Sequence, residues 1–290
     1  MEDETRNLAA VKVKSEELQI PYANLLPAFI LEEIVFYISE SEEADYFWLK
    51  DYSIFSLESY RGKAPFRLEY MLCSEEELTV QNVISRLDGI FQKEEIKKHC
   101  WQYQAEKIGN LIYVHLIGKI EELQIPIELV IERQTELELK PTKEELYLSL
   151  LNKKTEYLHY SVENLLSEHF IKILKNLELL GDLRSYDVIY HLLTKELNST
   201  RKVTEYLKKL AEQCQVPIET ERFEMICAYR ESPYMKKQWK NYLRREKKKT
   251  PSFEEVLDIL IAYFKPVWEA LKNGSYYLGD WMPELKRYLD

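Results

Sequence analysis

The chain has 290 residues, 46% of them hydrophobic, so it can bury a large core without disulfides or a structural metal. Its four cysteines are widely spaced and form no Cys-X-X-Cys pair, which predicts reduced thiols rather than a disulfide framework or a zinc site. The net charge of −10 excludes nucleic-acid binding over the whole surface, but not at a local basic patch. Seven glycines and no Gly-X-Gly-X-X-Gly or P-loop pattern exclude the commonest ATPase, kinase and dinucleotide-binding classes.

The N-terminal residues MEDETRNLAAVKVK are acidic and contain no apolar core of a signal peptide. No apolar run is expected to reach the roughly 18 to 20 residues that a membrane span requires. We therefore expect a cytoplasmic protein with no membrane partner.

The N-terminal half alternates between helical and strand patterns. Apolar residues at helical spacing predict a helix over residues 27–39 that begins near Pro27. Ser74 precedes three glutamates, which predicts an N-cap and a helix running to about Lys98. The other expected elements of this half are strands at 46–49, 66–72, 101–107, 111–119 and 125–132 and a short helix at 53–60.

From Pro141 onward almost every segment has helical periodicity, so we place a domain boundary there. The expected helices cover residues 142–154, 162–179, 183–197, 199–213, 217–229, 233–247 and 252–272. The sequence therefore predicts an α+β fold, in which residues 1–140 form an α/β domain and residues 141–290 form an all-helical C-terminal domain.

Several segments together resemble a known family. The order helix, strand, short helix, strand, long helix and further strands is the one expected of a nucleotidyltransferase core. SVENLLSEH at 161–169 and YDVIY at 186–190 resemble a helix and the following step in the AbiEii/AbiGii family of nucleotidyltransferase-like toxins. WKNYL at 239–243 and SFEEVL at 252–257 resemble that family's C-terminal tryptophan helix and the turn after it.

The resemblance covers about residues 25–272. It implies a mixed sheet with flanking helices, and a role in a toxin–antitoxin or phage-defence system. It also implies Mg²⁺ and a nucleoside triphosphate as cofactors if the chain is active, and RNA, often tRNA, or a cognate antitoxin or defence-complex protein as partner.

Active members of the family carry a Lys-Gly-Gly-Ser/Thr turn after the first strand, where bare backbone amides approach the triphosphate. Here the turn reads Lys50-Asp51-Tyr52-Ser53, so Lys50 and Ser53 match as phosphate-binding candidates and both glycines are replaced. Side chains would stand where backbone should meet phosphate, and Asp51 adds negative charge beside a polyanion. The sequence therefore predicts impaired triphosphate binding.

The next strand of an active member carries Asp-X-Asp, two acids on one side of the sheet that hold magnesium. Here Glu69 takes the first acid position and Met71 the second, and methionine is a poor ligand for a hard cation. Glu128 on a later strand matches the third acid. We expect Glu69 and Glu128 as catalytic residues and metal ligands, with Asp51 as a further ligand, if a one-metal site persists.

The helical region also departs from the family pattern. His169 stands where a lysine is usual and is a candidate phosphate ligand, although a neutral imidazole replaces a fixed positive charge poorly. Arg184 replaces an acid, whereas Asp187 is retained as a catalytic candidate. The alternative is that His169 is a polar helix residue and that Asp187 caps and packs the helix junction.

A cluster of basic residues near the C-terminus is the candidate nucleic-acid site. It contains Lys236, Lys237, Lys240, Arg244, Arg245, Lys247, Lys248 and Lys249, opposed in that run only by Glu246. Such a helix can hold a phosphate backbone, with affinity that falls steeply with salt. The alternative is a solvated helix end.

Three hypotheses follow. We favour a pseudoenzyme that keeps the nucleotidyltransferase fold as an RNA- or protein-binding module, because partial loss of a phosphoryl-transfer site is poorly tolerated. The second is an active, metal-dependent nucleotidyltransferase toxin that modifies tRNA or protein. The third is a structural partner without a ligand.

Overall fold

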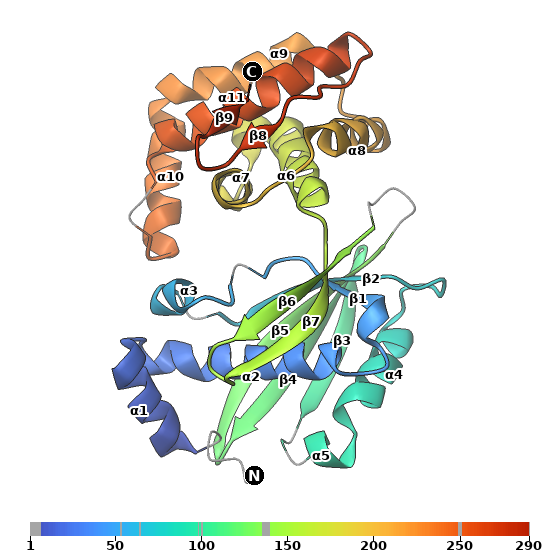
Figure 1. The fold of residues 1–290 in the computed structure, drawn as a ribbon, viewed down its shortest axis with the longest axis vertical. Coiled ribbons are helices and arrows are strands. Elements are labelled where there is room, and N and C mark those ends of the chain that lie inside the picture. The colour runs from blue at the N-terminus through green and yellow to red at the C-terminus, as the bar shows by residue number, and fades with distance from the viewer. Residues whose placement is uncertain are drawn as a thin grey trace. The chain divides into compact units, whose positions relative to one another are not determined.

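The computed structural model describes residues 7–52, 54–63, 65–97, 99, 101–134, 140–248 and 251–289. Contacts divide the chain into two units, the first ending at Tyr160 and the second beginning at Ser161. The first unit contains a mixed sheet with flanking helices and the second is mainly helical (Figure 1). The predicted fold class, a mixed sheet with helices followed by a helical C-terminal region, is confirmed.

A seven-stranded sheet in the order β3-β4-β5-β2-β1-β7-β6 forms the first unit. The β2/β5 and β1/β7 pairs are parallel, and the other neighbours are antiparallel. The strands are β1 (Phe47–Leu49), β2 (Arg67–Leu72), β3 (Gln102–Ile108), β4 (Leu111–Ile120), β5 (Leu123–Arg133), β6 (Thr142–Leu148) and β7 (Lys153–His159).

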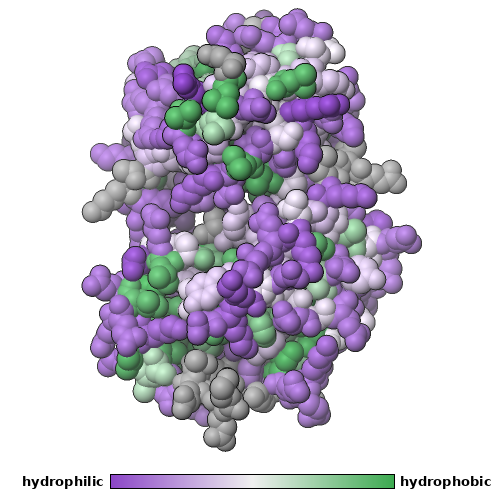
Figure 2. All heavy atoms as spheres, in the orientation of Figure 1, coloured by the Kyte–Doolittle hydropathy of each residue, from purple (hydrophilic) through white to green (hydrophobic). Residues whose placement is uncertain are grey.

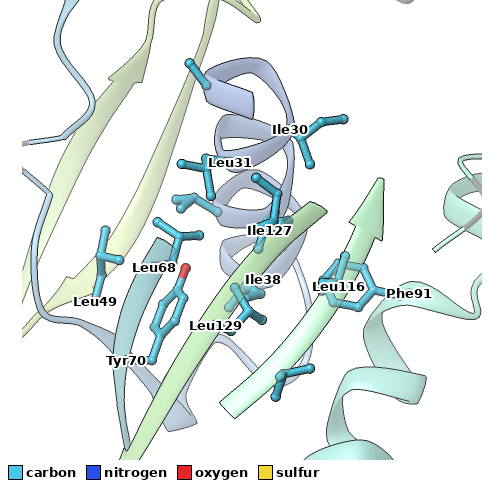
Figure 3. Close-up of a cluster of buried hydrophobic side chains, with 14 of the residues drawn as sticks. Ile30, Leu31, Ile38, Leu49, Leu68, Tyr70, Phe91, Leu116, Ile127 and Leu129 are labelled. Carbon is cyan, nitrogen blue, oxygen red and sulfur yellow. The ribbon is translucent and has the colours of Figure 1, made fainter. Parts of the chain in front are cut away.

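Helices α2 (Tyr22–Ser39) and α4 (Val80–Phe91) pack on one side of the sheet, which we call the first face. Because side chains alternate along a strand, every second residue of β2, β4 and β5 points into this core (Figure 3). Gly118 lets β4 approach α2 closely, since a Cβ there would meet the Ile30 side chain at 2.8 Å. The opposite side of the sheet, the second face, carries the alternate residues.

Three short helices complete the first unit. They are α1 (Leu8–Leu18), α3 (Leu57–Arg61) and α5 (Glu94–Lys97), and α1 and α3 both contact α2. The expected long helix at 74–98 is wrong, because α4 begins at Val80 with Thr79 as its N-cap and ends at Phe91. Ser74 instead accepts hydrogen bonds from the Glu76 amide and the Arg86 side chain, which closes a turn before the helix.

Helix α2 is apolar enough to cross a membrane by length and composition, in contrast to our expectation that no such run exists. Most of it is buried within the first unit, which accounts for its apolar sequence. It begins at Tyr22, before the expected start, and carries Pro27 inside. Burial against the sheet therefore outweighs the backbone hydrogen bond that proline removes.

The segment 142–154 is not the predicted helix, because it contains β6 and the start of β7. Cross-strand ion pairs of 2.6 Å join Lys143 to Glu156 and Lys154 to Glu145. Strand β6 is at the edge of the sheet and is mostly exposed, so it lacks the apolar alternation that identifies a strand in sequence. This hairpin moves residues 140–160 into the first unit, away from the boundary we placed at residue 140.

The second unit consists of helices and one small hairpin. The helices are α6 (Val162–Asn176), α7 (Arg184–Lys195), α8 (Thr200–Gln213), α9 (Thr220–Ala228), α10 (Pro233–Arg245) and α11 (Phe253–Lys272), and the hairpin is β8 (Trp281–Met282) with β9 (Arg287–Tyr288). A serine side chain caps the N-terminus of α6, α8, α10 and α11. Phe170 of α6 stacks on Phe264 of α11 with centroids 3.7 Å apart, which fixes the centre of this core.

Glu32 is the most deeply buried acid of the first unit, with no exposed surface. Its carboxylate accepts hydrogen bonds from the Tyr60 hydroxyl at 2.8 Å and from the amides of Leu150 at 2.8 Å and Leu151 at 3.1 Å. It therefore ties α2 to α3 and to the β6–β7 turn. Burial raises the pKa of Glu32 above its ordinary value of 4.5, because loss of water disfavours the charged form more than these hydrogen bonds favour it.

We predict that stability falls as pH rises above about 4.5, across the interval up to the raised pKa of folded Glu32. In that interval the folded state holds a proton that the unfolded chain has released, so raising the pH favours unfolding. Glu32→Gln should remove this part of the slope and cost roughly 1–3 kcal/mol of unfolding free energy. Urea denaturation at a series of pH values measures both, with exposed Glu58→Gln as the control; an unchanged slope in Glu32→Gln contradicts the prediction.

Candidate functional site

The turn after β1 is fixed by an aromatic contact rather than left open for a ligand. The Tyr52 ring lies edge-on against His159, with centroids 4.4 Å apart, and packs on the core of the first unit. The tyrosine that replaces a family glycine therefore has a structural partner. Asp51 is half-buried in the same turn, and Ser53 lies outside the described residues.

Lys50, the phosphate-binding candidate of this turn, forms an ion pair across the second face. Its ammonium nitrogen is 3.0 Å from Glu132 Oε2 and 4.8 Å from the centre of the Tyr160 ring. Only 11% of its side chain is exposed. Within the first unit the charge of Lys50 is thus already balanced by a carboxylate.

The parallel pairing of β2 with β5 arranges the candidate acids. Arg67 lies opposite Glu128, Glu69 opposite Val130, and Met71 opposite Glu132. The guanidinium of Arg67 is 2.5 Å from Glu128 Oε1, which makes a charge-assisted contact between neighbouring strands. The structure therefore places Glu69 and Glu128 on one face but in offset positions, with an arginine bound to the second acid.

Among the described residues no group of three or more His, Cys, Asp or Glu side chains is arranged to hold a metal ion. The predicted set of Glu69, Glu128 and Asp51 is not assembled, because Glu128 is paired with Arg67 and Asp51 lies on the turn after β1. A divalent cation beside Glu128 would meet the positive charge of Arg67. The residues present do not fit the implied magnesium site.

Sequence reasoning missed Glu132 as a residue of this site. It follows Glu128 by four positions on β5, so a period of two places both on the second face. That alternation was available from the sequence, but the partner Lys50 was not, because it is brought close only by the pairing of strands distant in the chain.

The candidates of the second unit, Asp187 and His169, each have hydrogen-bond partners within that unit. Asp187 Oδ2 accepts from the Tyr242 hydroxyl at 2.8 Å and from the Lys248 ammonium at 2.5 Å. Burial and the nearby Asp187 charge both raise the pKa of Tyr242. His169 Nδ1 lies 3.1 Å from the Ser185 hydroxyl, between α6 and α7. Asp187 thus joins α7 to α10 and to the segment after it.

The basic residues around α10 divide into paired and unpaired sets. Lys236 pairs with Glu254 at 2.8 Å, Arg245 with Asp182 at 2.9 Å, and Lys248 with Asp187. Lys249 lies outside the described residues. In the part of the chain that the structure describes, no ion-pair partner is found for the remaining set, which comprises Lys237, Lys240, Arg244 and Lys247.

The unpaired cations share one side of α10. Lys237, Lys240 and Arg244 follow the helical repeat, opposite the buried Met235 and Trp239, and all three are exposed. Lys247 follows just after the helix. We call these four residues the α10 basic face.

Figure 2 shows that hydrophilic residues cover most of the visible surface of the protein, with hydrophobic residues only in small groups.

No protein-family model and no curated protein matches the sequence significantly. Two solved structures from Helicobacter pylori are similar in shape. One, described as JHP933, has a TM-score of 0.45 and 8% identity, with 88% of this chain and 96% of that chain covered. The other, described as a putative nucleotidyltransferase, has a TM-score of 0.42 and 9% identity, with 88% and 98% covered. Because the sequence identities are only 8% and 9%, the roles of individual residues are argued from the geometry of this chain alone.

We predict that Arg67→Ala increases Mn²⁺ binding by about tenfold, because removal of the cation that is paired with Glu128 favours a divalent ion there. Electron paramagnetic resonance of free Mn²⁺ measures the change. Lys143→Ala is the matched control, since it also breaks an ion pair of the same sheet, to Glu156, but on the edge strand β6, away from β2 and β5. Equal affinities in the wild type and Arg67→Ala would show that Arg67 does not limit metal binding.

Proposed function

We propose that this chain is a nucleotidyltransferase-like protein that has lost metal-dependent catalysis and binds RNA through the α10 basic face. The observation that carries the proposal is the contrast in charge pairing. Lys50 and Arg67, the cations beside the candidate acids, are held by carboxylates, whereas Lys237, Lys240 and Arg244 are exposed and have no ion-pair partner among the residues that the structure describes.

A cluster of unpaired cations matters more on an acidic protein than on a basic one. The net charge of −10 repels a polyanion over most of the surface, so the RNA backbone would be attracted mainly to local groups of cations such as this one. Each phosphate that is neutralised releases condensed counterions, with a slope of roughly −0.7 per contact for single strands. The α10 basic face can therefore supply a salt-dependent but spatially limited binding site.

The second face supports the loss of catalysis. Phosphoryl transfer depends on positioned metal ions and unpaired cations that meet developing negative charge. Here Arg67 neutralises Glu128, Lys50 is bound to Glu132, and Met71 replaces an acid. In the toxin–antitoxin or phage-defence setting that the family resemblance implies, such a chain would act in the cytoplasm as a binding module, alone or with a cognate antitoxin.

We predict that the full chain binds tRNA with a steep salt dependence, and that replacing Lys237, Lys240 and Arg244 together by alanine weakens binding at least tenfold at about 50 mM salt. The slope of log affinity against log salt should fall by about two. Fluorescence anisotropy with labelled tRNA measures both quantities.

The matched control replaces Lys202, Lys208 and Lys209 of α8, which removes the same charge from exposed positions of the same unit. This variant should bind within about twofold of the wild type. If both triple variants lose affinity equally, net charge rather than the α10 basic face governs binding, and the proposal fails.

One observation favours an active enzyme as the second candidate. Glu132 lies opposite Met71 on the second face and is 41% exposed, so it could supply the acid that Met71 lacks. Glu69 lies on the same face, two residues before Met71 on β2. In an enzyme that used Glu69 and Glu132, the second metal ligand would lie on β5 instead of β2.

The two candidates differ in label transfer. With Mg²⁺ or Mn²⁺, total tRNA and each labelled nucleoside triphosphate, we predict no transfer by the wild-type chain, because its acids are offset or paired. Transfer that Glu69→Ala and Glu132→Gln both abolish, but exposed Glu122→Gln retains, would establish the enzyme and overturn the pseudoenzyme.

A further inference from the structure

A row of four polar side chains crosses the second face of the first unit. Strand pairing places Gln104 opposite His115, His115 opposite Glu128, and Glu128 opposite Arg67. His115 Nδ1 is 3.8 Å from Glu128 Oε2. One register thus aligns an amide, an imidazole, a carboxylate and a guanidinium across β3, β4, β5 and β2.

This row borders a groove of about 590 Å³. Gln102, Gln104, His115 and Glu128 line the groove, together with the apolar Phe66, Ile117 and Pro126. Phe66 is 45% exposed although it is a large apolar residue. The groove therefore combines an exposed ring with polar groups that remain accessible to a ligand.

The charges at the groove suit a neutral, flat ligand with a phosphate at one end. Arg67 compensates the carboxylate of Glu128. The Lys63 ammonium and the Arg67 guanidinium carbon lie over the Phe66 ring, 5.8 Å and 6.0 Å from its centre, so two cations lie next to the part of the groove that Phe66 lines. Nucleotides have this distribution of charge, with an uncharged base and an anionic phosphate.

The side chains also match how proteins recognise single-stranded RNA. Exposed aromatic rings stack on unpaired bases, and amide side chains bond the base edges. The amide of glutamine can both donate to N7 and accept from the N6 amino group of adenine, and two glutamines stand in consecutive outward positions on β3. A volume of 590 Å³ is large enough for a purine nucleoside.

We propose that this groove binds one purine base of an RNA strand, with the base against Phe66, its edge toward Gln102 and Gln104, and its phosphate toward Lys63 and Arg67. The groove is a binding site and performs no bond-forming step. The assignment of the ligand to RNA rests on the proposed function. The groove lies in the first unit and the α10 basic face in the second, so an experiment can contradict one proposal and leave the other standing.

The test uses the full chain labelled at isoleucine methyl groups and titrated with adenosine monophosphate, uridine monophosphate or ribose 5-phosphate. We expect adenosine monophosphate to shift the methyl signal of Ile117, which lines the groove, and to leave that of Ile38, in the first-face core, unchanged. Uridine monophosphate should bind about fivefold more weakly, and ribose 5-phosphate should not shift Ile117.

Phe66→Ala and Gln104→Ala should each weaken adenosine monophosphate binding by at least about fivefold, the lower end of what loss of one base contact costs. Tyr147→Ala and Gln124→Ala are the matched controls, because they remove an exposed ring and an exposed amide of the same sheet outside the groove. Both controls should bind as the wild type does.

The outcomes separate the two proposals. No Ile117 shift, equal shifts with ribose 5-phosphate, or equal losses in test and control variants overturn the purine site. Adenosine monophosphate binding at Ile117 in a chain that does not bind tRNA overturns RNA as the source of the base but keeps the nucleotide site. Loss of tRNA binding in the α10 triple variant, with the Ile117 shift intact, supports both.

Discussion

The parallel pairing of β2 with β5 is the constraint on which both faces of the first unit depend. In this register Leu68 and Tyr70 enter the core, whereas Arg67, Glu69 and Met71 face the other side. A shift by one residue would exchange the two sets and place charges against α2, which the hydrophobic core forbids. Packing on the first face therefore decides which charges meet on the second.

The consequence is a second face whose charges are largely balanced from within. Ion pairs with Arg67 and Lys50 balance the carboxylates of Glu128 and Glu132 without requiring a bound cation. Such half-exposed pairs contribute little to stability, since desolvation offsets most of the Coulomb gain. These ion pairs matter for ligand binding instead. Arg67 is bound to Glu128, which a metal ion would need, and Glu132 is bound to Lys50, which a triphosphate would need.

Much of the fold could be predicted from local patterns. Alternation located β2, β4 and β5, and helical periodicity located most helices of the second unit. Strands β6 and β7 were missed because β6 is a charged edge strand that is stabilised by pairing with a distant segment. Helix α1 has only weak amphipathic character, and so it left no clear signal in the sequence.

The site was harder to predict than the fold for the same reason. The sequence identifies Glu69 and Glu128 as acids on strands, but the arginine that binds Glu128 is a nonlocal neighbour. The sequence predicts only that the Tyr52 side chain obstructs phosphate. The structure adds that its ring packs against His159. Residue identities are local information, whereas ion pairing and ring contacts depend on the register of strands that are far apart in the chain.

Arg67 lies beside both the candidate metal ligand Glu128 and the proposed base site at Phe66. By pairing with Glu128 it places a positive charge where the resemblance implies a magnesium ligand, which disfavours a divalent cation. The same guanidinium lies beside the exposed Phe66 ring, which lines a groove together with Gln102, Gln104, His115 and Glu128. The proposed base site and a metal site at Glu128 would both depend on the charge of Arg67, so the two kinds of binding are alternatives at a single place on the sheet.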